Sequence, residues 1–217
     1  MSAARQSLVG SPISEPVTSF SRLCQAIIMM GKVFSHQYGD GLPSEAEQLK
    51  AASDLYGNAS ELATTISKEA DIEQDFFGYA SAIAVTYSTL CALCEGYSCP
   101  KGRCKSLGKE SSDMQTQAIE GLRSVGGSIV NFVDHINANT PLGQDLDRLS
   151  PIIMDSLYAA ASNYAWLVRE SGDVMYQTAL DAIRDCLKKL GARWRNAAEY
   201  LRILEAQEFS YAIGGAS

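Results

Sequence analysis

Cysteines are the residues best suited to chemistry in this chain of 217 residues. Four of the six fall within 14 residues, as Cys91, Cys94, Cys99 and Cys104. Tetrahedral zinc takes four soft ligands, commonly in pairs that flank a turn. Here the first pair falls inside a predicted helix, and no second CxxC follows. Cys91 and Cys94 fit equally well as small apolar core residues, so we assign no metal ligand.

Recognisable catalytic motifs are missing from the sequence. The two histidines, His36 and His135, fall on different predicted helices and form no HExxH motif. No nucleophile is paired with a base in a known pattern, and no glycine pattern matches a phosphate-binding loop. The scattered acidic residues fit solvated helix faces. We therefore expect neither an enzyme nor a bound cofactor.

The charge distribution argues against direct nucleic-acid binding. The chain holds 25 acidic and 18 basic residues, a net charge of −7. From Asp173 onward six acidic residues balance six basic ones, so the first 172 residues carry the whole excess. No segment has the basic surplus that phosphate neutralisation requires. We therefore expect no direct contact between this chain and nucleic acid.

Neither a leader nor a membrane span is predicted. The N-terminus, MSAARQSLVGSPISEPV, lacks a basic region followed by an apolar core, so we expect no secretory signal and reduced thiols. Residues 76–94 are long enough to cross a bilayer without a formal charge. Their Tyr, Ser, Thr and Gly residues favour a buried core helix instead.

Hydrophobic spacing predicts about six helices and no strand. We expect them over residues 20–37, 45–66, 71–97, 114–137, 151–169 and 173–207. Ser19 is the expected N-cap of the first, and Ser44 with Glu47 resembles a capping box for the second. Gly57-Asn58 falls mid-helix and is expected to bend or loosen it. Ser150-Pro151 is expected to start the fifth.

The closing stretch carries the strongest amphipathic pattern. Its apolar residues alternate at spacings of three and four along one helical stripe: Leu180, Ile183, Leu187, Leu190, Trp194, Ala197, Leu201 and Leu204. Gly172 and Asp173 supply a left-handed C′ residue and an N-cap between this helix and the preceding one. We therefore expect an antiparallel hairpin that closes an all-α bundle over residues 19–207, between flexible tails at 1–18 and 208–217.

Four aromatic residues gather in this C-terminal hairpin: Tyr164, Trp166, Trp194 and Tyr200. Filling the core is their simplest role. The alternative is that they line a small-molecule pocket between helices. Lys188, Arg195 and Arg202 repeat every seven residues opposite the apolar stripe, and with their acidic neighbours they indicate a solvated face of mixed charge.

Two segments resemble a known family. The pattern LKxLxxRWxxAxEYLxxLE, which Leu187 to Glu205 match, and the helix end TYSTLCALCEGYSCP at residues 86–100 are similar to the C-terminal part of the regulatory region of fungal zinc-cluster transcription factors. The resemblance covers residues from about 70 on. The family's DNA-binding module, a compact basic segment with six cysteines, is absent, because the cysteines here spread from Cys24 to Cys186.

The resemblance implies a nuclear, all-helical regulatory domain that responds to a metabolite or a protein partner and controls transcription without touching DNA itself. A stand-alone relative could equally reside in the cytoplasm. The alternative function is a helical protein-interaction scaffold unrelated to transcription. Effector, partner, target genes and oligomeric state are not specified by the sequence.

Overall fold

A computed structural model describes residues 17–39, 44–98 and 109–214. These residues form seven α-helices and two short 3-10 turns and contain no strand, which confirms the all-α class. The helices are α2 (Ser19–Tyr38), α3 (Glu45–Glu73), α4 (Phe76–Ser98), α5 (Lys109–Asn139), α6 (Ile153–Ser171), α7 (Val174–Gly191) and α8 (Arg195–Gly214), with 3-10 turns at Pro141–Gly143 and Leu146–Arg148.

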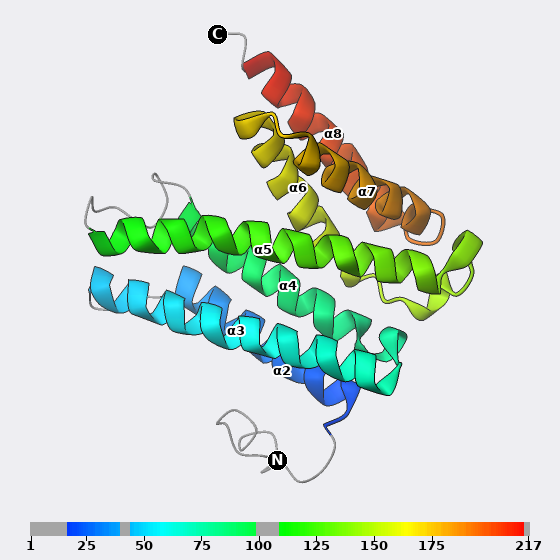
Figure 1. The fold of residues 1–217 in the computed structure, drawn as a ribbon, viewed down its shortest axis with the longest axis horizontal. Helices are drawn as coiled ribbons and strands as arrows, with labels where there is room; N and C mark the ends of the chain where they lie inside the picture. The colour runs from blue at the N-terminus through cyan, green and yellow to red at the C-terminus, as the bar shows by residue number, and fades with distance from the viewer. Residues whose placement is uncertain (1–16, 40–43, 99–108, 215–217) are drawn as a thin grey trace.

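Helix α4 forms the centre of the molecule. It packs against α2, α3, α5 and α6. Helices α7 and α8 pack on α6 and lie beyond it as seen from α4 (Figure 1). The residues of α4 are buried almost all round, as expected for a helix that is apolar on every face. Thr86 and Thr89 satisfy their buried hydroxyls by donating to the carbonyls of Ala82 and Val85, at 2.8 and 2.7 Å.

The length and composition of α4 would also suit a membrane span. In its most apolar window 72% of the residues are buried inside the molecule, as in the core helix of a soluble protein. The helix begins at Phe76, five residues later than predicted, because α3 continues to Glu73. The chain turns at Gln74, which takes the left-handed conformation (φ 53°), and Asp75 accepts a hydrogen bond from the Gly78 amide.

Local capping signals in the sequence were mostly correct. Ser44 accepts a hydrogen bond from the Glu47 amide at the start of α3, as the capping-box pattern predicts. Gly172 (φ 65°) ends α6, and Asp173 caps α7. The predicted N-cap Ser19 is wrong by one residue, because Thr18 accepts from the Ser21 amide instead.

Two further predictions were wrong, one about the start of a helix and one about the middle of a helix. Helix α6 begins at Ile153, because residues 151–152 form a turn in which the Ser150 hydroxyl accepts from the Ile152 amide. Helix α3 runs unbroken through Gly57-Asn58 for 29 residues. Packing of its buried Ala and Ile side chains on α4 outweighs the weak helix propensity of glycine.

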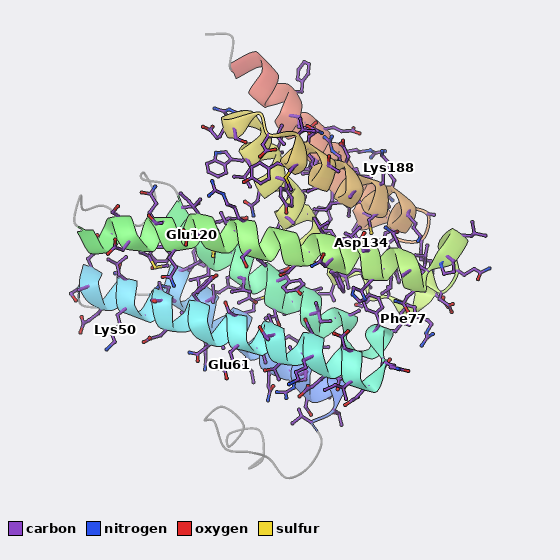
Figure 2. The ribbon with its side chains drawn as sticks, in the orientation of Figure 1. Lys50, Glu61, Phe77, Glu120, Asp134 and Lys188 are labelled. Carbon is purple, nitrogen blue, oxygen red and sulfur yellow. The ribbon has the colours of Figure 1, made fainter. Side chains whose placement is uncertain are left out.

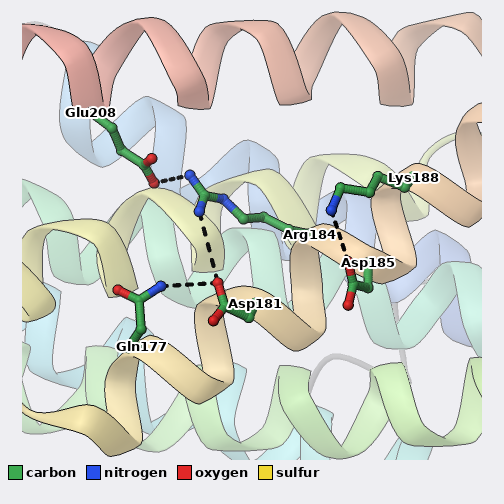
Figure 3. Close-up of polar contacts among 6 residues, drawn as sticks. All are labelled: Gln177, Asp181, Arg184, Asp185, Lys188 and Glu208. Atoms are coloured by element: carbon green, nitrogen blue, oxygen red, sulfur yellow. Dashed lines mark hydrogen bonds and ion pairs between the residues drawn. The ribbon is translucent and has the colours of Figure 1, made fainter.

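The predicted single helix over residues 173–207 is two helices. Helix α7 ends at Gly191, residues 192–194 turn, and α8 folds back and continues to Gly214, past the predicted tail boundary. A straight helix would carry half of the apolar stripe beyond the reach of α6. The reversal instead buries Leu187 and Leu204 in the same core. Arg184 of α7 joins the two helices by an ion pair with Glu208 of α8 (Figure 3).

The outer faces of α7 and α8 carry mixed charge, as predicted. Lys188 Nζ lies 2.9 Å from Asp185 Oδ1, and Arg202 Nη1 lies 3.1 Å from Glu199 Oε1. All four side chains are largely exposed, so each pair contributes little to stability. These basic residues are partnered within their own helices and form no basic stripe.

Candidate functional site

A groove between α3 and α5, with α4 as its floor, is the clearest candidate site in the described part of the chain. The two wall helices lie side by side in front of α4 (Figure 1) but make few direct contacts with each other. The groove has a section of about 310 Å³ and a section of about 200 Å³. Ser67, Tyr87 and Ser128 line both sections, which makes them one continuous channel.

Small residues on both walls keep the groove open. The larger section is lined by Ser60, Ala63, Thr64 and Ser67 on α3, by Tyr87 and Leu90 on α4, and by Gly121, Ser124, Val125 and Ser128 on α5, with Tyr56 at one end. On each wall helix the spacing of three and four places these residues on one face. Short side chains opposite one another leave space that larger residues would fill.

Aromatic rings bound the groove at both ends. Tyr56 lies over Gly121, where an added Cβ would come within 2.9 Å of its ring. At the other end the Phe76 ring stacks on His135, with centroids 5.9 Å apart, and lies 5.6 Å from the ring of Phe132. The lining side chains are therefore larger at the two ends of the groove than in the serine-lined part between them.

The chemical character of the lining is apolar on the floor and hydroxylic on the walls. Ile83 and Leu90 supply aliphatic surface, while serines, a threonine and Tyr56 supply hydroxyls. Burial raises the pKa of Tyr56, so its phenol stays protonated and can donate a hydrogen bond. The Thr64 and Ser128 hydroxyls donate to backbone carbonyls within their own helices, which leaves their oxygen atoms free to accept.

The electrostatics of the groove disfavour an anion. Among the residues that line it, Asp71 is the only one with a formal charge, and none is Lys or Arg. Glu61 on α3 and Glu120 and Asp134 on α5 add exposed negative charge along the same helices (Figure 2). The groove offers no basic residue for an anion and no buried carboxylate for a cation, because Asp71 is exposed, so an uncharged ligand fits it best.

The four aromatic residues singled out in the sequence lie elsewhere, around α6. Tyr164 is buried and points at α5, so that an added Cβ on Gly126 would lie 2.9 Å from its hydroxyl. Tyr200 stacks on Tyr158 with ring centroids 4.7 Å apart. Trp166 and Trp194 are half-buried against the main core. None of the four lines either section of the groove.

One of these aromatic residues has an unsatisfied polar atom. Trp194 Nε1 is buried and has no hydrogen-bond partner within the described structure, while Arg193 lies over the indole ring at 4.9 Å. Trp194 occupies the turn between α7 and α8, where its ring covers the end of the core. Tyr164 is thus a core residue, Trp166, Trp194 and Tyr200 pack partly buried against the core, and a role in lining a pocket stays a prediction.

Three of the four cysteines that the structure describes are core residues, and the fourth, Cys24 on α2, is half-buried. Cys91 and Cys94 are both 1% exposed on α4, and Cys186 is buried on α7. Burial raises the pKa of Cys91 and brings the pKa of Cys94 and of Cys186 to about 12, so these thiols stay protonated and unreactive. No metal-ligand cluster is present among the described residues. Cys99 and Cys104 lie outside them.

Sequence reasoning missed the groove although its signal was present. Ser60, Thr64 and Ser67 recur on one face of α3, and Gly121, Ser124 and Ser128 recur on one face of α5. Faces of small hydroxylic residues on long helices are read most simply as solvated surface. Only the tertiary structure shows that the two faces point toward each other across α4.

Comparison of the chain with protein-family models, with curated proteins and with solved structures finds no match in any of the three. The geometry of the groove and the pattern of the sequence are therefore the basis for a functional proposal.

Proposed function

We propose that this chain is a regulatory module that binds an elongated, uncharged small molecule in the groove between α3 and α5. The observation that carries the proposal is the groove itself, in which two long helices face each other with small hydroxylic residues instead of packing together. A channel of this kind is the usual location for a ligand between helices.

The dimensions of the groove define the shape of the ligand. Its lining extends along α3 from Tyr56 to Asp71, which corresponds to about 22 Å at 1.5 Å per residue. A volume of a few hundred Å³ over this length accommodates a narrow chain and excludes another helix, which is about 10 Å across. The ligand therefore has an apolar side that lies on Leu90 and Ile83 and hydroxyl or amide groups that face the walls.

Ligand binding would regulate the protein by changing the spacing of the helices that form the groove. Helices α3 and α5 contact α4 extensively but each other only slightly. A ligand that touches both walls adds contacts that the empty protein lacks, and it stabilises one spacing of the two helices. The change would reach the C-terminal helices through α5, which packs against both α6 and α7.

Transcription control is the setting that the sequence pattern supports. Residues Leu187 to Glu205 resemble the regulatory region of fungal zinc-cluster factors, and the chain has no basic surplus with which to hold DNA. The module thus acts in the nucleus through the protein to which it is attached or bound. In this proposal it is a binding module and not an enzyme, in line with the sequence, which carries no recognisable catalytic motif.

A thermal-shift screen tests the ligand class. Neutral glycosides, polyols and amides are compared with carboxylates of matched size. A neutral ligand present at 100 times its Kd adds about 2.7 kcal/mol to the free energy of unfolding, which raises the Tm of a domain of this size by about 5–11 °C. Ser128→Leu fills the middle of the groove and should abolish the shift, whereas Ser53→Leu on the exposed side of α3 should retain it. Stronger binding of the carboxylates, or full binding by Ser128→Leu, would contradict the proposal.

A reporter assay tests the transcriptional role separately. The chain is fused to an unrelated DNA-binding domain, and we expect expression of the reporter to change when the fusion is present. Ser128→Leu should alter this response and Ser53→Leu should not. A fusion that leaves reporter expression unchanged would refute the role in transcription, while the thermal-shift screen would still decide whether the groove binds a ligand.

A further inference from the structure

Within the described part of the chain, the outward face of α2 is apolar and exposed. The residues of α2 that enter the core are Ala26, Met29, Val33 and Gln37. Ile27 and Phe34 lie outside the core and are 50% and 43% exposed. Together with Phe20 and Tyr38, which are 72% and 79% exposed, they leave large apolar side chains in solvent along the whole helix.

These residues follow a heptad pattern. Six positions on this face alternate at spacings of four and three, and we call them the α2 stripe: Phe20, Cys24, Ile27, Gly31, Phe34 and Tyr38. The stripe contains no charged residue, and α2 contains no Asp or Glu. Arg22 lies off the stripe and is paired with Glu69 of α3. A helix face with this repeat is suited to packing along another helix.

Gly31, in the middle of the α2 stripe, is not explained by contacts among the residues that the structure describes. A Cβ at this position would meet nothing within 4 Å, so no neighbouring element requires a glycine. Glycine inside a helix costs stability relative to alanine. Gly57 and Gly127 are similarly unopposed, but only Gly31 lies between large exposed apolar side chains. A glycine there lets a second helix approach closely.

Large and small side chains alternate along the α2 stripe so that two antiparallel copies fit together. In an antiparallel pair centred at residue 29, Ile27 faces Gly31 and Phe34 faces Cys24 across the seam. Each large side chain then meets a small one, and Phe20 meets Tyr38 at the two ends. A parallel pair would place Gly31 against Gly31 and Phe34 against Phe34, which leaves a gap and then a clash.

The exposed area is sufficient for a weak but specific pair. A fully exposed aromatic side chain offers about 150–250 Å², so the exposed fractions of Phe20, Phe34 and Tyr38 give roughly 300–500 Å² per copy. Ile27 and Ile28, at 50% and 39% exposure, add to this. Two copies therefore bury about 1,000 Å², which is the lower limit for a specific interface.

We propose that the α2 stripe is the seam of a two-fold symmetric homodimer, in which the α2 helices of two copies pack antiparallel. Such an interface is isologous, since the same residues serve both partners. It lies on α2, away from the groove, and does not depend on the proposed ligand.

The mass of the full chain in solution tests the dimer. At about 100 µM, since interfaces near the lower size limit associate weakly, we expect twice the chain mass of 23.4 kDa. Ile27→Asp and Gly31→Leu should both give the monomer mass, with helical content and Tm no lower than those of the dissociated wild type. Gly31→Leu is informative because its side chain enters open space in one copy and clashes only with Ile27 of the other. A monomeric wild-type chain, or a dimer that survives both substitutions, would overturn the proposal.

Oxidative cross-linking tests the orientation. Phe34→Cys places a thiol opposite Cys24 of the second copy, so a mild oxidant should give a covalent dimer in high yield. Adding Cys24→Ser to this variant should remove the cross-link. A wild-type chain that cross-links through Cys24 to Cys24 would show a parallel seam and refute the antiparallel one.

Discussion

Two adjacent glycines of α5 provide a sharp test of the tertiary structure. Gly126 and Gly127 share the same helical environment but face different surroundings. A Cβ on Gly126 would lie 2.9 Å from the Tyr164 hydroxyl oxygen and 3.0 Å from Cζ of the same ring. A Cβ on Gly127 would meet nothing within 4 Å. We therefore expect Gly126→Ala and Gly127→Ala to change the stability in opposite directions.

The magnitudes follow from two effects. Replacing a helical glycine by alanine stabilises by about 0.5–1 kcal/mol when the new methyl group is accommodated. Overpacking against a buried ring costs about 1–3 kcal/mol, and Tyr164 is only 6% exposed, so its ring has little room to move. At about 2–4 °C per kcal/mol for a domain of this size, Gly127→Ala should raise the Tm by about 1–4 °C. Gly126→Ala should lower it by up to about 8 °C.

Thermal unfolding followed by circular dichroism measures both values. The double variant Gly126→Ala/Tyr164→Phe removes the hydroxyl oxygen from the contact and should recover part of the loss. Single Tyr164→Phe serves as its reference, so that the coupling between the two positions is obtained from the cycle. Equal increases in Tm for both glycine variants would refute the packing of α6 against α5.

Three other substitutions test the closing helices and the centre of the fold. Leu187→Asp places a charge where the side chain is 0% exposed, so it should cost about 4 kcal/mol or more and unfold the domain; a variant with wild-type Tm would show that α7 is not buried there. Asp173→Ala removes the acceptor that lies 2.8 Å from the Met175 amide and should cost about 1 kcal/mol, or about 2–4 °C in Tm. Desolvation, aided by the charge of Asp155 and opposed by the hydrogen bond from Asn163, raises the pKa of Glu95 above its ordinary 4.5. The charged form is therefore penalised in the fold, and because Glu95 keeps contact with solvent, Glu95→Gln should stabilise the protein only slightly at neutral pH. Urea titrations at several pH values measure this gain in the free energy of unfolding. The gain should shrink as the pH falls through the raised pKa of Glu95 and should vanish below pH 4.5. A gain that is the same at every pH would mean that the Glu95 carboxyl is not desolvated.

The sequence predicted local structure well where one residue decides the geometry. Ser44 with Glu47, Gly172 and Asp173 all cap helices as predicted, because a side-chain acceptor or a left-handed glycine acts within one turn. The boundary between α3 and α4 was placed too early, because Gln74 makes a turn that has no glycine or proline signal.

Periodicity alone misled where the choice of partner decides the outcome. Residues 173–207 have a continuous apolar stripe, yet the chain reverses after Gly191 so that both halves of the stripe reach one core. On α2 the larger side chains Ile27 and Phe34 lie outside, while smaller Ala26 and Val33 lie inside. Close packing against α4 favours the smaller residues, and nothing local to α2 distinguishes its two apolar faces.

By itself the sequence determined the all-α class, most of the helices, and a charge distribution without a basic surplus. These properties follow from local propensity and from composition. The tertiary structure alone decided that the serine faces of α3 and α5 oppose each other and that the apolar stripe of α2 is uncovered. Both depend on which helices meet at which rotation about their axes, and that is fixed by the packing of the whole core.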